Sequence, residues 1–565
     1  MDESTSVISK VKNDIKDRIA KAIDKAKAKG DLPDYVEADI KITMPARPEQ
    51  GDFATSVAMA LASEVKCDDR SVAGAIVRYL SLEDSWIQRV DIAGPGFLNF
   101  FLSTGWLEEA MADIWKKGPA YGSTNYGGGK KILIEFVSAN PTGPLNAVNA
   151  RAAAIGDCLA SLLEASGYRV SREYYVNDAG NQVDVLADSL EARYRQVLGQ
   201  EVPFPENGYR GEYLIDIAKE LVAEKGDTIL ELPDSERHEW LKQYVVSRIV
   251  EQQKQTLLNY GLEYDTWFSE KSLRDQGAPE AALELMRQKG LTYEKDGAEW
   301  LNSTMFGDDK DRVVVKSDGN FTYIVPDIAY HKNKFDRGYD HLINILGPDH
   351  HGYVTRLKAG IAALGYPPES LEVIIAQTVR LVRGKQVVKM SKRGGEFISM
   401  DELLEEAGKD ACRFFFLMRA PSSHLDFDLD LARLQSNENP VYYVQYAHAR
   451  IASIFRQARQ EGVVPALGPN EINFSLLREP SEIQMMKLLA AFPEEVYEFG
   501  QAREPNRLIN YMMNVASAFH SFYTQCRVLG EDKELSAARL YLARVCQIVL
   551  ANALRMAGVS APESM

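Results

Sequence analysis

Residues 132–151 constrain the fold of this chain more than any other segment, because a strand, a tight turn and a helix follow one another there. The apolar run that starts at Ile132 reads as a buried strand, and the prolines and glycine within 141–144 form the turn. The helix that follows opens with two amides, Asn146 and Asn149. Because the amino end of a helix carries a partial positive charge and outward N–H groups, this segment predicts a phosphate-binding site.

The residues around this segment extend the pattern to a parallel sheet. Gly167 ends the helix, and residues 170–176 form the next strand. Such a β-strand–helix–β-strand unit joins parallel strands by a right-handed crossover, which predicts a Rossmann-like α/β domain over 125–400. The charged and mostly helical residues from about 184 to 305 are interpreted as one insertion in it. Further strands of this domain are expected at 312–316, 321–325, 342–346 and 371–375.

A small α+β domain is predicted at the amino-terminal side, over residues 1–112. Apolar residues recur at helical spacing from Ile8 onward, and Gly30 stands where such a helix would stop. Residues 36–42 alternate like a half-buried strand, and 91–101 form a second strand entered through a Gly-Pro-Gly bend. A glycine-rich linker then leads into the α/β domain.

The carboxyl-terminal part is predicted to be all α. After residue 400, leucine, tyrosine and alanine recur at three- and four-residue spacing. We divide this part near the sequence NENP into a helical connector over 401–440 and a helical domain over 441–565. With 565 residues the chain is too long for one core, which agrees with several domains.

The composition is that of a soluble globular protein, with 45% hydrophobic and 26% charged residues. No apolar run reaches the thickness of a bilayer, so a cytoplasmic protein without a membrane segment is expected. Five scattered cysteines without a CxxC or Cys/His cluster predict neither disulfides nor a protein-bound metal. The net charge of −16 argues against indiscriminate nucleic-acid binding, but a local basic patch still permits a folded RNA partner. The lysine-rich first helix is such a patch or, equally, a solvated helix face.

A second informative segment is the lysine loop, the sequence KMSKR at 389–393, which is followed by Gly394 and Gly395. Three cations on a loop that glycines keep mobile suit a clamp for polyphosphate charge. Alone, the pentapeptide could be only a solvated loop. Together with the turn at 141–144 on the same sheet, it predicts a polyphosphate site.

The order of these motifs resembles the class I aminoacyl-tRNA synthetases, and among them the bacterial type of arginyl-tRNA synthetase, over essentially the whole chain. The motifs are EFVSANPTGPL at 135–145, REYYVNDAG at 172–180, FGDDKDR at 306–312, YIVPDIAYH at 323–331, KMSKR at 389–393, NENPVYYVQYAHAR at 437–450 and NALR at 552–555. The resemblance implies ATP-dependent activation of L-arginine to an adenylate, followed by transfer to the terminal ribose of tRNA(Arg). Enzymes of this family usually need the tRNA for the first step.

Tyr323 and Asp327 are the predicted receptor for the arginine guanidinium. An aromatic face stacks on a planar cation, and a carboxylate accepts two parallel N–H bonds. Without the other motifs, these two residues would read as a strand-end tyrosine and a helix N-cap aspartate. The resemblance places further residues around the amino acid. The predicted arginine-binding set is Glu135, Ser138, Asn140, Tyr323, Asp327 and, at a strand end, Gln377.

The resemblance implies that ATP, as its Mg²⁺ complex, binds between the helix start, the loop after the strand at 342–346 and the lysine loop. Lys389, Lys392, Asn146 and Asn149 are the expected catalytic residues. The two histidines at 350 and 351 could instead be ordinary polar loop residues. The predicted ATP-binding set is Gly143, Pro144, Asn146, Asn149, Asp349, His350, Lys389, Met390, Ser391 and Lys392.

For tRNA, the resemblance implies an amino-terminal domain that contacts the elbow and a carboxyl-terminal domain that holds the anticodon. Phe97 and Asn99 share one face of a strand, and a ring beside an amide suits an unstacked base, although Phe97 could be a core residue. Tyr446, Arg450 and Arg555 are the candidates in the last domain, where most tyrosines are expected to pack helices together. The family further implies a monomer.

The helix start departs from the family pattern. Most class I enzymes open it with histidine, a variable residue, glycine and histidine, whereas this chain has Asn146, Ala147, Val148 and Asn149. An amide is a neutral donor, and losing one well-aimed donor costs roughly 3–4 kcal/mol in a transition state. The chain is therefore either a working synthetase or a catalytically weakened paralogue that binds arginine, nucleotide or tRNA. Because the other ligands remain, we favour the working enzyme.

Overall fold

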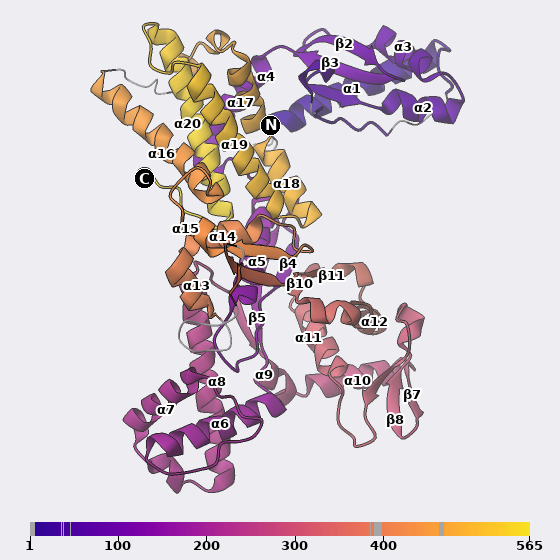
Figure 1. Cartoon of the computed structure of the whole chain (residues 1–565). Helices are drawn as coiled ribbons and strands as arrows, with labels where there is room; N and C mark the ends of the chain where they lie inside the picture. The colour runs from indigo at the N-terminus through magenta and orange to yellow at the C-terminus, as the bar shows by residue number, and fades with distance from the viewer. Residues whose placement is uncertain are drawn as a thin grey trace.

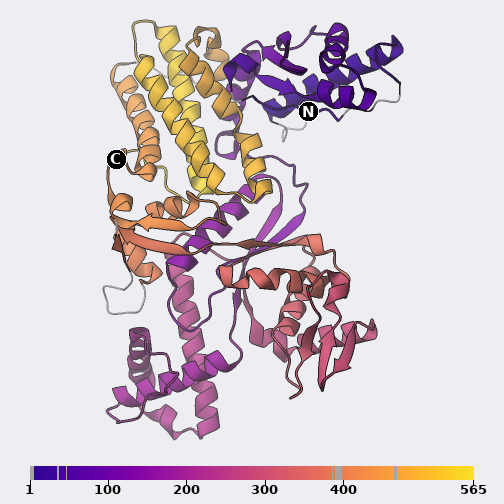
Figure 2. The ribbon, with the colours of Figure 1, turned by 45° about the vertical axis from the view of Figure 1, so that its right-hand side comes forward.

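The computed structural model describes residues 6–34, 37, 39–45, 47–384, 386–388, 398–462 and 468–565. Its central part is an α/β domain from which a helical insertion projects, at the bottom of Figure 1. An amino-terminal domain, in indigo, and a carboxyl-terminal helical bundle, in yellow, lie at the opposite end. Figure 2 shows the same separation from a second direction, so the chain is elongated along this axis.

A five-stranded parallel sheet forms the core of the central domain, in the order β11-β10-β4-β5-β6. Its strands are β4 (Lys131–Glu135), β5 (Arg169–Val176), β6 (Thr266–Ser269), β10 (His341–Leu346) and β11 (Leu371–Ile375). All neighbours pair in parallel, so the carboxyl ends of the strands lie at one edge, where ligands bind in such folds. The prediction of a Rossmann-like α/β domain is confirmed.

Helix α5 (Ala147–Ala165) makes the crossover between β4 and β5 and is buried along most of its length. Its alanines and Gly156 allow close approach to the sheet, since a Cβ at Gly156 would meet the Phe136 ring at 2.3 Å. After the helix, Gly167 adopts a φ of 86°, a left-handed conformation that suits a helix end. The predicted β-strand–helix–β-strand unit is therefore present as expected.

Between β5 and β6 the chain forms a helical insertion with its own hydrophobic core, made of α6 (Asn181–Val197), α7 (Glu212–Lys225) and α8 (Asp234–Asn259). A short 3₁₀ helix, η3 (Thr228–Glu231), joins the last two. The prediction of one insertion over 184–305 is wrong, because β6 returns to the parallel sheet within it. The strand has only four residues, too few for a distinct sequence pattern.

A second excursion follows β6 and is mixed rather than helical. It contains α9 (Glu270–Asp275), α10 (Ala278–Gln288), η4 (Ser303–Phe306) and the antiparallel strands β7 (Thr292–Lys295), β8 (Ala298–Leu301) and β9 (Arg312–Val315). The strand predicted at 312–316 therefore exists but belongs to this small sheet. The strand predicted at 321–325 is wrong, since α11 (Ile324–Asp336) begins there. Pro326 lies in its first turn, where no backbone donor is needed, so a helix start outcompetes the β-branched residues.

The loop after β10 forms η5 (Pro348–Tyr353), α12 (Val354–Leu364) and η6 (Pro368–Ser370), which lead into β11. A second three-stranded sheet, ordered β13-β12-β14, follows and contains β12 (Val379–Arg383), β13 (Gln386–Val387) and β14 (Leu425–Asp428). Helices α13 (Met400–Ala407), α14 (Lys409–Leu417) and α15 (Leu429–Arg433) pack around it. The connector predicted as helical over 401–440 therefore includes a strand, β14, which pairs with β12.

The amino-terminal domain begins with α1 (Val7–Ala28), as predicted. It continues with η1 (Pro48–Gln50), β1 (Phe53–Thr55), α2 (Val57–Val65), α3 (Asp69–Tyr79), β2 (Ile87–Ala93) and β3 (Phe97–Leu102). The single strand predicted over 91–101 is two strands of a hairpin that turns at Gly94–Gly96. The strand predicted over 36–42 is wrong in its described residues, since only Thr43 makes one bridge, to Ala54. Helix α4 (Gly105–Lys117) and η2 (Gly118–Ala120) complete the passage to the linker.

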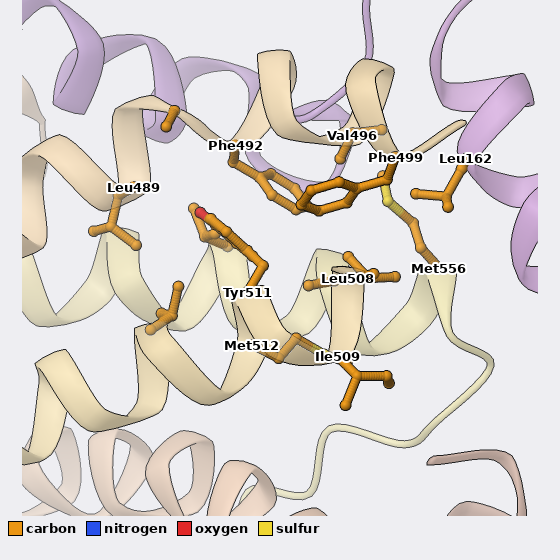
Figure 3. Packing of buried hydrophobic residues seen from close by; sticks show 14 of the residues in the cluster. Leu162, Leu489, Phe492, Val496, Phe499, Leu508, Ile509, Tyr511, Met512 and Met556 are labelled. Carbon is orange, nitrogen blue, oxygen red and sulfur yellow. The ribbon is translucent and has the colours of Figure 1, made fainter. Parts of the chain in front are cut away.

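The carboxyl-terminal bundle is helical, as predicted, and its first long helix starts at Pro440. It consists of α16 (Pro440–Gln460), α17 (Pro480–Ala490), α18 (Phe492–Ala502), α19 (Asn506–Gln525) and α20 (Lys533–Met556), with η7 (Pro469–Glu471) and η8 (Phe474–Leu476) before α17. By length and composition α20 could cross a membrane, but 72% of its most apolar window is buried in the protein. Phe492 and Phe499 of α18 lie side by side, with Phe499 toward Leu162 of α5 (Figure 3), so the bundle packs on the crossover helix of the central domain.

Candidate active site

The start of α5 is held by a reciprocal cap between the two asparagines. Asn146 Oδ1 accepts from the N–H groups of Val148 at 2.9 Å and Asn149 at 3.2 Å, and the Asn146 N–H donates to Asn149 Oδ1 at 2.9 Å. Both amide oxygens therefore face into the helix. Two of the helix N–H groups that the sequence assigned to phosphate are occupied by Asn146, which corrects that expectation. Within the described parts of the chain neither amide nitrogen has an acceptor, so both remain as outward donors.

The chain returns to this helix start directly after the lysine loop. Ser399 forms an antiparallel bridge with Asn146, and the Met400 N–H donates to Leu145 O at 2.7 Å. The loop residues themselves, Lys389, Met390, Ser391 and Lys392, lie outside the described residues. The chain at Ser399 and Met400 therefore lies beside the start of α5.

The turn between β4 and α5 has an unusual backbone. Val137 and Ser138 have φ values of 70° and 39°, in the left-handed region that a β-branched residue rarely adopts. Ser138 Oγ donates to Glu135 Oε1 at 3.1 Å and accepts from the Tyr175 N–H at 3.1 Å. Two of the predicted arginine-binding residues, Glu135 and Ser138, therefore lie in direct contact.

Glu135 is held by a buried network of polar side chains. Its Oε2 accepts from Lys334 Nζ at 2.5 Å, and the same ammonium donates to Asn344 Oδ1 at 3.2 Å. The Asn344 amide donates to His331 Nε2 at 2.8 Å, so His331 Nδ1 carries the proton and donates to Asp327 O at 2.7 Å. Burial and the nearby Lys334 charge keep the pKa of His331 well below its ordinary value. With His331 neutral, this network joins the end of β4 to α11 through the Lys334–Glu135 ion pair and uncharged hydrogen bonds.

Asp327 lies in the first turn of α11 and receives a hydrogen bond from the Tyr353 hydroxyl. Burial raises the pKa of Asp327 to about 7; the Tyr353 hydrogen bond opposes this, and the charges of Glu135 and Glu270 add to it. Burial and the same carboxylates also raise the pKa of Tyr175, which lies among them. Three carboxylates therefore share this site. Glu135 pairs with Lys334 and Glu270 with Arg274, whereas Asp327 has no cationic partner among the described residues, which favours a cationic ligand beside it.

Tyr323 is the N-cap residue of α11, four residues before Asp327, and its side chain is 87% exposed. It is neither a strand-end residue nor a core residue. Gln377 follows β11, and its N–H donates to Pro421 O while its carbonyl accepts from Arg151 at 2.8 Å. Asp349 and His350 are exposed in η5, and His350 Nε2 lies 3.4 Å from Asp349 Oδ2. Of the predicted residues, Glu135 ends β4, Asp349 follows β10 and Gln377 follows β11, at the carboxyl ends of these three parallel strands.

Sequence comparison assigns families to three stretches of the chain. Residues 13–102 match the family described as Arginyl tRNA synthetase N terminal domain, and 444–565 match the DALR anticodon binding domain. Residues 113–417, more than half of the chain, match the family described as tRNA synthetases class I (R), catalytic domain. The chain belongs to the arginyl-tRNA synthetases. The resemblance found in the motifs is thereby confirmed.

Curated relatives cover the synthetase from end to end. An arginine–tRNA ligase of Caldanaerobacter subterraneus subsp. tengcongensis is 48% identical over 99% of this chain and 100% of its own. One of Desulfitobacterium hafniense is 47% identical over the same shares. Arginyl-tRNA synthetase structures from Thermus thermophilus and Plasmodium falciparum share the fold, each with a TM-score of 0.75 at 23% and 17% identity. They cover 98% of this chain and 100% and 99% of their own.

The residues of the synthetase that were predicted to bind tRNA differ in exposure, and several of them contact other protein groups. Phe97 is 40% exposed at the start of β3 and so is not a core residue, whereas Asn99 is only 6% exposed. Tyr446 stacks on Tyr442 and His520, and the Arg450 guanidinium lies 4.9 Å from the Tyr523 ring centre. Arg555 instead donates to Pro119 O at 2.6 Å, beside η2. Most of these groups contact protein, as the sequence predicted for the tyrosines.

Several residues that shape the site of the synthetase were missed. Lys334 follows Asp327 by two helical turns and would have been found if α11 had been recognised. Tyr353 and Gln253 come from distant segments, and nothing in their local sequence indicates their contacts. Arg151, fully buried in α5, donates to four backbone carbonyls, those of Gln377, Thr378, Ala420 and Ser423. Burial lowers the pKa of Arg151 to about 10.

In the described residues no group of three or more His, Cys, Asp or Glu could hold a metal ion.

Proposed function

We propose that this synthetase activates L-arginine at the carboxyl edge of its parallel sheet and transfers it to tRNA(Arg). The arginine carboxylate attacks the α-phosphorus of ATP, bound as its Mg²⁺ complex, and pyrophosphate leaves. The terminal ribose hydroxyl of the tRNA then attacks the arginyl carbonyl and releases AMP. The proposal includes a cytoplasmic location and a monomeric enzyme.

The observation that carries this proposal is the group of three carboxylates around Tyr175. Glu135 pairs with Lys334 and Glu270 pairs with Arg274, so among the described residues Asp327 is the carboxylate of this group without a cation. Arginine brings two cationic groups, a guanidinium and an ammonium. We assign the guanidinium to Asp327 and Tyr323 and the ammonium to the side of Ser138 and Asn140, because planar cations suit a carboxylate beside an aromatic ring.

The proposed ATP site lies at the start of α5. The outward amides of Asn146 and Asn149 act as neutral donors to the phosphates, with Gly143 and Pro144 in the preceding turn. Lys389 and Lys392 supply the positive charge that the amides lack, with Met390 and Ser391 in the same segment of the sequence, and Asp349 and His350 contribute from η5 after β10. Donors fixed before the reaction stabilise charge that develops on the phosphates. Nothing in the comparisons favours the weakened paralogue.

The decisive test is arginine-dependent ATP–pyrophosphate exchange, measured with and without tRNA(Arg), together with charging of that tRNA. We expect exchange when tRNA is present and formation of arginyl-tRNA. Lysine and citrulline serve as controls, since the first lacks the planar guanidinium and the second lacks its charge. Absence of both exchange and charging would contradict the proposal and leave a protein that only binds its ligands.

A further inference from the structure

Helix α8 connects the helical insertion to the central domain. Leu241, Val245 and Ile249 in its first part belong to the separate core of the insertion, whereas Leu257 near its end belongs to the main core. Gln253 lies between the two cores and is only 1% exposed. A polar side chain buried at such a place must find partners, because an unsatisfied amide is costly in the interior.

The partners of Gln253 lie in the turn between β4 and α5. Its Nε2 donates to Gly143 O at 2.9 Å and to Asn140 O at 3.2 Å. Its Oε1 accepts from the Tyr174 hydroxyl at 3.0 Å, and that hydroxyl accepts from the Ala139 N–H at 3.1 Å. One buried amide and one buried hydroxyl therefore hold the backbone of 139–143 at three points.

This turn needs external support. Val137 and Ser138, at its start, are in the left-handed region, which costs free energy for residues other than glycine. Such a conformation persists only where the surroundings hold it. A second contact from the insertion acts on the same turn, since the Tyr213 hydroxyl of α7 donates to Thr142 O.

One turn further along α8, a second buried residue reaches the other side of the site. Thr256 is 6% exposed, and its hydroxyl donates to Asp401 Oδ2 of α13 at 2.9 Å. Helix α13 begins directly after Ser399, which forms a bridge with Asn146 at the start of α5. Gln253 and Thr256 are three residues apart and therefore share one face of α8.

We propose that the insertion sets the geometry of the site through this face of α8, with Gln253 as the positioning residue of the arginine side and Thr256 as that of the ATP side. This proposal rests on the proposed function. Gln253 touches no substrate; it fixes the turn that carries Ser138 and Asn140. Loss of its two donated hydrogen bonds lets the strained backbone at Val137 and Ser138 relax, which moves the groups that face arginine.

The test compares the full-length protein with Gln253→Ala, Tyr174→Phe and Gln255→Ala. Gln255 is exposed on the same helix, and its one side-chain hydrogen bond to a described residue is to Asn259 of that helix at 3.0 Å, so its loss is the matched control. Calorimetric titration with L-arginine should give a Kd about tenfold weaker for Gln253→Ala and about threefold weaker for Tyr174→Phe, and unchanged for Gln255→Ala. If Gln253→Ala does not fold, Tyr174→Phe carries the test.

Thr256→Val supplies the opposite comparison. It should raise the KM for ATP in the exchange reaction several-fold while the Kd for arginine stays within twofold of the wild-type value. The proposal would be overturned if Gln253→Ala lowered the thermal stability but left the Kd for arginine unchanged. It would also be overturned if Gln253→Ala and Thr256→Val each weakened the use of arginine and of ATP to the same extent. A wild-type protein that binds arginine but performs no exchange would overturn the proposed function and leave the arginine arm of this test valid. A wild-type protein that binds no arginine would overturn both.

Discussion

At the scale of single residues, Asp327 is a partly buried carboxylate that has no cationic partner among the described residues. Lys334, whose charge acts on it, bonds to Glu135 and Asn344 instead. The folded-state pKa of Asp327, about 7, lies above the ordinary aspartate value of about 3.9. Ionisation of Asp327 therefore opposes folding, and the stabilisation given by its neutral form is lost as the pH rises through 7. Arginine would offset this cost when bound.

We predict that Asp327→Asn weakens arginine use and at the same time stabilises the arginine-free protein at pH 8. The KM for arginine should rise at least about thirtyfold, the equivalent of ~2 kcal/mol for truncating a buried charge pair. The gain in melting temperature should shrink as the pH falls from 8 toward 5, where the wild-type carboxyl becomes protonated. In the wild type, the KM for arginine should rise below pH 7. An arginine KM that is unchanged in Asp327→Asn would remove Asp327 from the guanidinium site.

The two roles of Asn146, helix cap and phosphate donor, can be separated by substitution. Asn146→Asp retains an oxygen that caps α5, so the melting temperature should not fall. It replaces the outward amide by a second carboxylate oxygen, and the exchange rate should fall about a hundredfold, as for removal of one transition-state donor. Asn146→Ser tests the same loss without added charge. If Asn146→Ser exchanges at the wild-type rate, the amide is not a phosphate donor and serves only as a cap.

At the scale of elements, two glycines at the surfaces where α5 packs differ in the room that they leave for a side chain. Gly156 of α5 faces the Phe136 ring, where a Cβ would lie at 2.3 Å. Gly500 of α18 faces Leu163 of α5, where a Cβ would lie at 3.5 Å, an ordinary contact. Both residues are inside helices, where alanine is preferred over glycine by about 1 kcal/mol.

Alanine at these two positions should therefore shift stability in opposite directions. Gly156→Ala should lower the melting temperature of the central domain by several degrees, because overpacking of about 1–3 kcal/mol exceeds the helix preference. Gly500→Ala should leave it unchanged or raise it slightly. Differential scanning calorimetry of both variants gives the comparison. A stabilised Gly156→Ala variant would show that α5 can move away from the sheet.

The elements predicted best from sequence are those with long periodic patterns, such as α1 and α5, and the buried strands β10 and β11. Short elements were missed because β6 has too few residues to show alternation and joins its sheet only through distant contacts. The start of α11 was assigned to a strand because β-branched residues there outweighed the single proline. In the site, residue types were predictable from motifs, whereas Gln253 was not, since its role depends on where α8 ends in space. The reciprocal cap of the two asparagines follows from their spacing but was not anticipated.

At the scale of the whole molecule, three segments meet at Glu494 of α18. Its Oε1 accepts from Ser6 at 2.6 Å, Ser9 at 2.8 Å and Tyr126 at 2.7 Å. Burial would raise the pKa of Glu494, but these hydroxyls and the charge of Lys12 lower it overall. The carboxylate therefore fastens the amino-terminal domain and the linker to the bundle, and this contribution to stability is lost only as the pH falls below about 4.3.

Glu494→Ala should loosen this junction and weaken use of tRNA without changing the amino-acid site. We expect the KM for tRNA in the charging reaction to rise several-fold, because the amino-terminal domain loses its fixed orientation relative to the bundle. Amide hydrogen exchange in the first turn of α1 should accelerate, while the Kd for arginine stays constant. Glu494→Gln, which can still accept hydrogen bonds, is the conservative control. If the KM for tRNA stays unchanged while amide hydrogen exchange in α1 becomes faster, the junction contributes to stability alone.

The order of the strands also determines how long β4 waits for its second neighbour during synthesis on the ribosome. β4 lies in the middle of the sheet, and β5 follows it closely, but its other neighbour, β10, comes only after both excursions. At ~5–20 residues per second, the roughly 200 residues between β4 and β10 take about 10–40 s to leave the ribosome. During that interval one edge of β4, the strand that ends at Glu135, has no partner. A chain that terminates before residue 341 retains this open edge and can pair there with another nascent chain.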